Sequence, residues 1–243
     1  MTRKQDPFDF PLHQDIAYRF DGLYQWLHRK YQLQPVEITL GKQVVRIYKV
    51  ADSDRVLNEV LEGTGDAALD NPYWGELWPS AVRLAEYLCR EEGTLAGKRV
   101  LELGCGMGLA GIAAHIAGAE VLLSDIAEDA LRLAELNWIV NFYSAPQLRR
   151  IDWLAPDCPE RFEVILAADV AYEERLFRPF IHTLDQLLAP EGCLYLSEPN
   201  RKIARTFFTL LAESGFDSER QASVGESTGG DMAPTIYRVC RKG

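Results

Sequence analysis

The feature that most constrains the fold is a short apolar strand that runs directly into a glycine-rich turn and a helix. Residues 99–103 are apolar and β-prone, and residues 109–117 are small and apolar at helical spacing. Between them lie Gly104, Gly106 and Gly108, whose bare backbone lets a ligand approach the main chain closely. This order predicts a nucleoside-cofactor site at the carboxyl edge of a parallel sheet.

Neighbouring residues narrow the type of cofactor. Residues 106–111 match the dinucleotide pattern G-x-G-x-x-G, but the first glycine of that pattern should follow the strand directly, and here Gly104 does. Counted from Gly104, the third glycine position holds Leu109. Glu102, inside the strand, suits a cationic or polar ligand better than a pyrophosphate. Asp125 ends the next strand, where it can accept hydrogen bonds from a ribose diol.

Composition limits the class of protein. The chain has 243 residues, of which 47% are hydrophobic and 26% charged, enough for one α/β domain with an N-terminal extension. A net charge of −10 argues against a generic nucleic-acid binder. Five cysteines without a C-x-x-C pair argue against a disulfide framework or a zinc site, and four scattered histidines suggest no metal. With no membrane-length segment and no apolar leader, we expect a cytoplasmic protein without membrane contact.

The order of elements predicts an extension followed by a layered domain. We expect residues 1–71 to form the extension, with a polar tail, a helix, a β-hairpin, a short helix and a connector at residues 1–12, 13–31, 36–50, 53–61 and 63–71. Residues 72–243 form the main domain. Its expected helices cover residues 80–92, 109–117, 127–141, 174–188 and 201–214, and its strands 99–103, 121–125, 148–151, 162–169, 193–197, 216–224 and 235–241. This alternation predicts an α/β fold with a doubly wound, seven-stranded sheet closed by an antiparallel terminal hairpin around Gly229-Gly230.

A second unusual stretch, residues 72–79, holds two tryptophans, a tyrosine and two prolines. Such side chains are costly to leave exposed, so Trp74 and Trp78 could fill the core beneath the extension. Alternatively, Trp78 covers the cofactor while Tyr73 and Trp74 line the entrance for a second substrate, since aromatic walls suit positively charged groups and aliphatic stems. We favour the second interpretation for Trp78 and leave both open for Tyr73 and Trp74.

Two further strand ends pair an acidic residue with an aromatic one. Asp152 and Trp153 follow a brief strand, where they could bind an adenine amino group and stack on its ring, or else cap a turn and fill the core. Asp169 ends the strand at residues 162–169, and Tyr172 follows three residues later. They could face the reacting group, or else cap a helix and pack. We favour ligand binding for both pairs, because they leave the same sheet edge as the glycine loop.

Together these motifs resemble those of one family. They are, in order, the hairpin, Pro72-Tyr-Trp, Leu77-Trp-Pro, Leu101-Glu-Leu-Gly-Cys-Gly-Met-Gly-Leu, Asp125, Asp152-Trp and Asp169-Val-Ala-Tyr. They resemble the seven-β-strand, S-adenosylmethionine-dependent protein-lysine methyltransferases called methyltransferase family 16, and especially the branch that modifies the electron-transfer flavoprotein β-subunit. The resemblance spans about residues 36–241 and implies a Rossmann-like methyltransferase sheet with S-adenosylmethionine as cofactor. It implies these cofactor-binding residues: Trp78, Glu102, Gly104, Cys105, Gly106, Gly108, Asp125, Ile126, Asp152, Trp153 and Ala168.

The resemblance further implies that Asp169 and Tyr172 are catalytic and that Tyr73 and Trp74 contact the substrate. Methyl transfer from a sulfonium to an amine is an in-line displacement, for which an enzyme mainly supplies alignment. A lysine amine has a pKa of about 10.4 and arrives protonated, but a partly desolvated aromatic site disfavours the ammonium. We expect Asp169 to attract the ammonium and orient the amine, and Tyr172 to line the channel.

Three functions stay open at this point. The first is a protein-lysine methyltransferase, the second a small-molecule amine N-methyltransferase on the same fold, and the third a cofactor-binding interaction protein without catalysis. The presence of both Asp169 and Tyr172 argues against the third. A nucleic-acid methyltransferase is disfavoured, because no Asn-Pro-Pro-Tyr-type motif follows the fourth strand and Glu198-Pro-Asn-Arg201 follows the fifth. We expect a monomer that acts on a protein presenting lysine, without nucleic acid, membrane or metal.

Overall fold

The computed structural model describes residues 14–53, 72–90, 94–221 and 233–243. Four predicted features therefore lie outside the described residues. They are the tail at residues 1–12, the short helix after residue 53, the connector at residues 63–71 and the turn at Gly229-Gly230.

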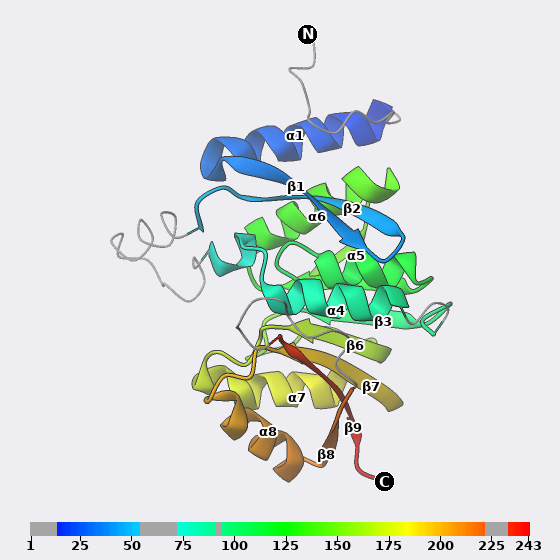
Figure 1. Ribbon diagram of the computed structural model, residues 1–243, viewed down its shortest axis with the longest axis vertical. Coiled ribbons are helices and arrows are strands. Elements are labelled where there is room, and N and C mark those ends of the chain that lie inside the picture. Colours follow the sequence, from blue (N-terminus) through cyan, green and yellow to red (C-terminus); the bar gives the residue numbers. More distant parts are fainter. Residues whose placement is uncertain (1–13, 54–71, 91–93, 222–232) are drawn as a thin grey trace.

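A seven-stranded sheet forms the centre of the molecule (Figure 1). Its strands are β3 (Arg99–Leu103), β4 (Glu120–Asp125), β5 (Gln147–Arg150), β6 (Phe162–Ala168), β7 (Leu188–Glu198), β8 (Phe216–Arg220) and β9 (Thr235–Arg241). The strand order is β5-β4-β3-β6-β7-β9-β8, and β9 runs in the direction opposite to the other six strands. The predicted parallel sheet with an antiparallel terminal pair is confirmed.

Helices cover both faces of this sheet. They are α4 (Pro79–Arg90), α5 (Leu109–Ile116), α6 (Glu128–Phe142), α7 (Phe177–Leu187), which follows a 3-10 turn at Glu174–Leu176, and α8 (Ala204–Glu213). The first three share one hydrophobic cluster and the last two share another. Within β6, Val164 and Leu166 enter the first cluster while Ile165 and Ala167 enter the second, so both faces of the strand are buried. This two-sided burial explains its continuous apolar sequence.

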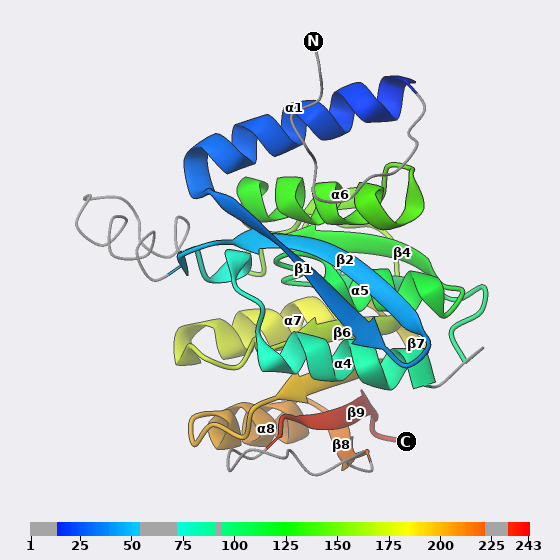
Figure 2. The ribbon, with the colours of Figure 1, turned by 45° about the horizontal axis from the view of Figure 1, so that its top comes forward.

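The N-terminal elements pack on α6 rather than standing apart. Helix α1 (Gln14–Tyr31) lies at the end of the molecule opposite α8 and β8, and the hairpin of β1 (Leu33–Leu40) and β2 (Gln43–Val50) lies near it (Figure 2). Leu27 and Tyr48 are buried in the same cluster as Ile139 of α6. The extension therefore shares its core with the sheet, and the boundary between residues 71 and 72 stays a prediction.

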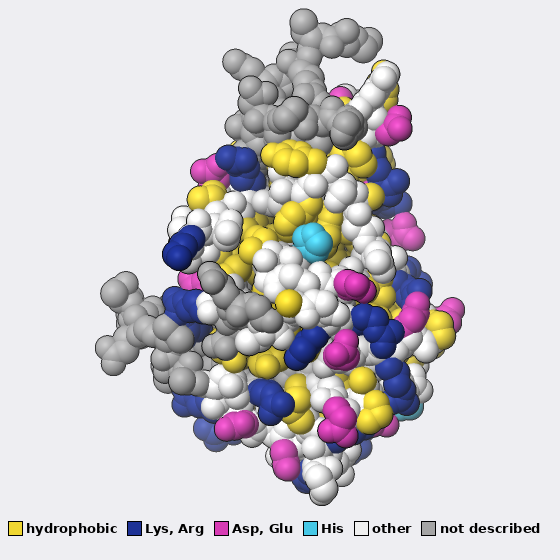
Figure 3. All heavy atoms as spheres, turned by 90° about the vertical axis from the view of Figure 1, so that its right-hand side faces the viewer, with side chains coloured by type: hydrophobic (Ala, Val, Ile, Leu, Met, Phe, Trp, Pro, Cys, Tyr) yellow, Lys and Arg dark blue, Asp and Glu magenta, His cyan; other side chains and the backbone are white. Residues whose placement is uncertain are grey.

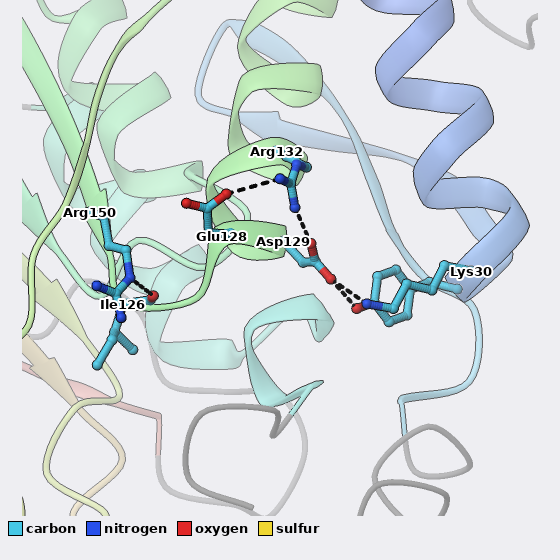
Figure 4. A network of polar contacts seen from close by, with 7 residues as sticks. Lys30, Ile126, Glu128, Asp129, Arg132 and Arg150 are labelled. Carbon is cyan, nitrogen blue, oxygen red and sulfur yellow. Dashed lines mark hydrogen bonds and ion pairs between the residues drawn. The ribbon is translucent and has the colours of Figure 1, made fainter. Parts of the chain in front are cut away.

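A polar network fastens α1 to the start of α6 (Figure 4). The Asp129 carboxylate accepts hydrogen bonds from Lys30 Nζ (2.7 Å), from the Tyr31 hydroxyl and from Arg132 (2.6 Å). Burial alone would raise the pKa of Asp129, but these three donors outweigh it and lower the pKa. Arg19 adds an ion pair with Glu135, which is nearly buried. The charged side of α1 thus faces acidic side chains of α6.

Two asparagine side chains of α6 form hydrogen bonds with the backbone of β2, as a third strand would. Asn137 Oδ1 accepts from Tyr48 N (2.7 Å) and its Nδ2 donates to Tyr48 O (3.1 Å). Asn141, one helical turn later on the same face, forms the same pair with Arg46 N (3.0 Å) and O (2.7 Å). Asn137 Nδ2 also donates to Met107 O in the glycine loop (3.0 Å). A single buried amide therefore joins the hairpin, the helix and the loop.

The cysteines were expected to form no disulfide framework, and for one pair this expectation is wrong. Cys193 of β7 and Cys240 of β9 form a disulfide, with Cα atoms 4.6 Å apart. They lie directly opposite each other in the antiparallel register, which composition and spacing do not reveal because 47 residues separate them. Cys89, Cys105 and Cys158 are free thiols.

The surface mixes both signs of charge. On the face shown in Figure 3, lysine and arginine side chains lie between aspartates and glutamates, with hydrophobic side chains among them. The net charge of −10 is therefore not gathered into one acidic field on this face. Among the described residues, no helix combines the length and the apolarity needed to cross a bilayer.

The Asn137 contacts predict a specific loss of stability. Asn137→Ala removes the partners of two Tyr48 backbone groups and of Met107 O, and should lower the free energy of unfolding by about 3 kcal/mol, because buried unsatisfied groups cost about 1–3 kcal/mol each. Urea titration measures this cost. Asn141→Ala is the matched control: its site is half-buried, water can replace the amide, and about 1 kcal/mol is expected. Equal costs at the two positions would contradict the assigned role of Asn137.

Candidate functional site

The glycine loop between β3 and α5 adopts a backbone that other residues rarely adopt. Gly104, Gly106 and Gly108 have φ angles of +69°, +50° and +82°. A Cβ atom on Gly104 would lie 3.2 Å from the Trp153 ring, and one on Gly106 would lie 3.0 Å from Trp74 O. The glycines are therefore needed both for their φ angles and for the close approach of two aromatic residues. Cys105, between them, is buried, which raises the pKa of its thiol.

Glu102 anchors the start of α5. Its side chain is 3% exposed, and Oε2 accepts a hydrogen bond from Gly111 N at 2.8 Å. Gly111 is the third residue of α5, whose N-cap Gly108 has no side chain to accept from the first-turn amides. Burial raises the pKa of Glu102 to about 8, and the nearby charge of Asp125 adds to the effect. A carboxyl group inside the strand thus serves as a cap for the following helix.

Asp125 binds the loop from the neighbouring strand. Its Oδ2 accepts from Gly106 N (2.9 Å) and its Oδ1 from Ala127 N (3.0 Å), at the start of α6. The residue is 9% exposed, and burial raises its pKa despite these donors. Each carboxylate oxygen retains a further lone pair for a ligand. The predicted ribose acceptor therefore lies against the glycine loop.

The segment that follows β5 lies next to Asp125, because Ile151 N donates a hydrogen bond to Asp125 O (3.1 Å). Asp152 Oδ1 accepts from Leu154 N (2.9 Å), so it caps a turn. Trp153 packs edge-on against Phe180, with ring centroids 5.0 Å apart, while its far edge borders Gly104. Asp152 thus caps a turn and Trp153 packs in the core, as the sequence allowed. The Trp153 ring also forms one wall beside the glycine loop.

Ile126 and Ala168 are half-buried at two of these strand ends. Ile126 O accepts from Arg150 Nε at 3.0 Å (Figure 4), which fixes the exposed arginine across the end of β5. Ala168 is the last residue of β6 and pairs with Ser197 of β7. Both positions lie at the carboxyl edge of the sheet, where the resemblance assigns them to the cofactor.

Three aromatic side chains gather in front of the sheet edge. Tyr73 lies 5.8 Å from Trp78 and 6.5 Å from Tyr172, measured between ring centroids. Tyr73 and Tyr172 are 40% and 45% exposed, so the cluster is open to solvent. Partial desolvation of its side chain raises the pKa of Tyr172, and the charge of Asp125 contributes to the shift. The structure therefore brings three of the five predicted aromatic site residues together beside the cofactor strands.

Trp74 lies elsewhere. Its ring packs edge-on against Tyr31 of α1 at a centroid distance of 5.0 Å, and it borders the core cluster shared by α1 and α6. Its carbonyl oxygen abuts Gly106. This environment favours the interpretation that Trp74 fills the core beneath the extension. The backbone of Trp74, and not its ring, lies against the glycine loop.

Asp169 has a partner that sequence reasoning missed. Its side chain is nearly buried and forms an ion pair with Arg201. Its φ of +63° lies in the left-handed region, which asparagine and aspartate tolerate best among non-glycine residues. Its amide donates to Ser197 O (3.0 Å), which fixes this bend beside β7. The bend aims the carboxylate across the sheet edge toward Arg201.

Glu198 completes this charged group. It is fully buried at the end of β7, accepts from Arg201 N (3.1 Å) and lies 3.7 Å from Arg201 Nη1. Burial raises the pKa of Glu198 to about 7, and Asp169 adds to this while Arg201 opposes it. The available sequence signal was an acidic residue, Glu198, that ends an apolar strand and is followed by an arginine three residues later.

Comparison with known proteins agrees with this architecture. Residues 68–214, more than half of the chain, match the family described as lysine methyltransferase. EEF1A lysine methyltransferase 3 from Mus musculus is 31% identical over 149 residues, covering 59% of this chain and 64% of that protein. The electron transfer flavoprotein beta subunit lysine methyltransferase from Danio rerio is 36% identical over 107 residues, covering 44% and 41%.

A solved structure shows a similar fold. The ribosomal protein L11 methylase from Lactobacillus delbrueckii subsp. bulgaricus superposes with a TM-score of 0.54 at 25% identity, covering 66% of this chain and 77% of that one. Among curated sequences, the chain spans 64% of the length of EEF1A lysine methyltransferase 3. The predicted fold class is thus confirmed.

The buried carboxyl of Glu102 predicts a pH-dependent stability. In the unfolded chain this group ionises near its ordinary pKa of 4.5, while in the folded chain it keeps its proton up to about pH 8. Wild-type stability should therefore fall relative to Glu102→Gln as the pH rises from 4.5 to 8, by at most about 1.4 kcal/mol per pH unit. Urea titrations between pH 5 and 8 measure the gap. Glu120→Gln, at an exposed site, is the control, and a gap independent of pH would refute the buried neutral carboxyl.

Proposed function

Since the chain belongs to the lysine methyltransferase family, we propose that it transfers a methyl group from S-adenosylmethionine to lysine side chains of a protein. One arrangement supports this most directly: the open aromatic cluster of Tyr73, Trp78 and Tyr172 lies beside the strand ends that carry the glycine loop and Asp125. Aromatic faces attract both a sulfonium and an ammonium. The names of the two curated relatives, which are lysine methyltransferases, point to the same acceptor.

The described residues fit the cofactor that the family uses. The bare backbone at Gly104 and Gly106 offers close approach, and Asp125 has free lone pairs for the ribose hydroxyls. The Trp153 ring provides a face for the adenine next to Gly104, and Asp152 can accept from the adenine amino group. Glu102 places a carboxyl beneath the loop, where a positively charged ligand would lower its pKa. S-adenosylmethionine supplies the electrophilic methyl group when bound.

The acceptor amine is proposed to enter past Tyr73 and Tyr172. Both rings are partly exposed, so they can enclose an aliphatic lysine stem and remove part of its water. Asp169 attracts the ammonium and orients the amine after its proton has left to water, and the ion pair with Arg201 fixes the carboxylate for this task. Together, Asp169 and the aromatic cluster would hold the amine lone pair toward the methyl group that bound S-adenosylmethionine would supply.

We propose further that the protein is a cytoplasmic monomer that acts on neither nucleic acid nor membranes. The net charge of −10 supports a protein acceptor over a polyanion, because an acidic surface repels phosphates. The Cys193–Cys240 disulfide argues against a cytoplasmic location, since such bonds are rare in a reducing cytoplasm. Cell fractionation with antibody detection tests the location directly.

The activity is tested by incubating the purified chain with labelled S-adenosylmethionine and a soluble cell extract. Label is expected in the protein fraction, on lysine after hydrolysis and mass analysis. Label confined to small molecules would establish the alternative, an amine N-methyltransferase on the same fold. Absence of label from both fractions, with the cofactor bound, would favour a non-catalytic binding protein.

Two aspartate variants should separate chemistry from cofactor binding. Asp169→Ala should bind S-adenosylmethionine nearly normally but lose about 100-fold in methylation rate, because misplacing the amine is that costly. Asp125→Ala should instead weaken cofactor binding about tenfold through lost charge-assisted hydrogen bonds. Calorimetric binding and initial rates report the two quantities, with circular dichroism confirming that both variants fold. Unchanged turnover in Asp169→Ala would remove that residue from the mechanism.

A further inference from the structure

A separate pocket of about 290 Å³ opens at the carboxyl end of β7, next to Asp169 but in the opposite direction from the glycine loop. Three arginines line it: Arg201, Arg205 and Arg220. Phe208 and Tyr237 supply an aromatic wall, with ring centroids 4.4 Å apart. The pocket therefore combines several positive charges with an apolar surface that can take an aliphatic stem.

The positive charge of the pocket is only partly neutralised. Arg201 is shared between Asp169 and Glu198, so its charge is matched within the protein. Arg205 and Arg220 are exposed at the pocket, and neither forms an ion pair with a carboxylate among the residues that the structure describes. Within the described part of the chain, two arginines thus line one pocket without an acidic partner, in a protein whose net charge is −10.

The strand order places this pocket on the acceptor side of the site. The cofactor residues follow β3, β4 and β5, which form one half of the sheet, and Asp169 follows the central strand β6. Strand β7 is the next one along, and Glu198 at its end lines the pocket. Because β6 and β7 are parallel, their carboxyl ends lie at the same edge. A group in the pocket would therefore be a neighbour of the amine at Asp169.

We propose that this pocket binds a carboxylate of the acceptor, namely an aspartate or glutamate side chain close to the methylated lysine. The proposal rests on the function proposed above and specifies the class of protein segment that the enzyme accepts. Guanidinium groups bind carboxylates through paired, charge-assisted hydrogen bonds, and both Arg205 and Arg220 line this pocket. The wall of Phe208 and Tyr237 packs against the methylene groups of such a side chain.

The buried Glu198 does not oppose this assignment. Its raised pKa of about 7 means that much of it is protonated at neutral pH, so it repels an incoming carboxylate less than an ordinary glutamate would. Protonated, it can donate a hydrogen bond. Asp169 faces Arg201, and among the described residues the other charged groups that line the pocket are the three arginines. The balance of charge at the pocket is therefore positive.

A direct binding test uses glutarate, a small dicarboxylate, as the probe. Phenylglyoxal modifies accessible arginines, and mass spectrometry gives the modification rate of each. Glutarate at millimolar concentration should slow the modification of Arg205 and Arg220 several-fold but leave Arg238 unchanged. Arg238 is the matched control, because it is exposed on β9 next to Tyr237 but points to the other side of the strand. Equal effects at all three arginines would overturn the proposal.

A second test follows the acceptor reaction in a dialysed protein extract with labelled S-adenosylmethionine. The double variant Arg205→Gln, Arg220→Gln should lower the initial rate at limiting extract about tenfold, without changing the Michaelis constant for S-adenosylmethionine. Arg238→Gln should stay within about twofold of wild type, as isolated surface changes usually do. Glutarate should compete with the extract for wild type and have little effect on the double variant. A double variant with wild-type rate and wild-type glutarate inhibition overturns the proposal.

The two tests also separate the carboxylate pocket from the proposed function. If wild type labels no protein, the lysine methyltransferase proposal fails, while glutarate protection of Arg205 and Arg220 still decides whether the pocket binds carboxylates. If wild type labels proteins, mapping of the labelled lysines should find acidic residues near them in the folded acceptors. Labelled lysines without acidic neighbours would overturn the pocket assignment and leave the methyltransferase standing.

Discussion

The site depends first on one buried amide. Asn137 is fully buried in α6, where its side chain bonds to both backbone groups of Tyr48 and to the carbonyl of Met107. Through it, the edge of the N-terminal hairpin and the glycine loop share a single anchor. Because a buried amide is costly to leave unsatisfied, packing of any one of these three segments favours packing of the other two. The extension is therefore part of the scaffold that shapes the loop.

Two carboxyl groups then hold the loop from beneath and from the side. Glu102 bonds to the first turn of α5, and Asp125 bonds to Gly106 N and Ala127 N. Burial raises the pKa of both groups, so each is costly to ionise until a ligand or the backbone compensates its charge. A cationic cofactor supplies that compensation and a pyrophosphate opposes it. The electrostatics of the folded loop thus agree with the cationic or polar cofactor that Glu102 indicated in the sequence.

The sequence predicted the local features well because they depend on short-range patterns. The strand–glycine–helix unit and the acidic residues at or just after three strand ends, Asp125, Asp152 and Asp169, all follow from residues close together in the chain. What it missed depends on tertiary register. Tyr31 contacts Trp74 and Cys193 meets Cys240 only after distant segments pack. No periodicity reports which residues face each other across such distances.

The Asp169–Arg201 ion pair links the segments that follow β6 and β7 at the carboxyl edge of the sheet. The carboxylate that is to attract the acceptor ammonium already has a cationic partner, so an amine gains less there than at a free aspartate. An acceptor carboxylate in the neighbouring pocket would attract Arg201 and weaken its hold on Asp169. The ammonium would then meet a more negative carboxylate. Acceptor and pocket would therefore reinforce each other, and a lysine without a nearby acidic group would have to compete with Arg201 unaided.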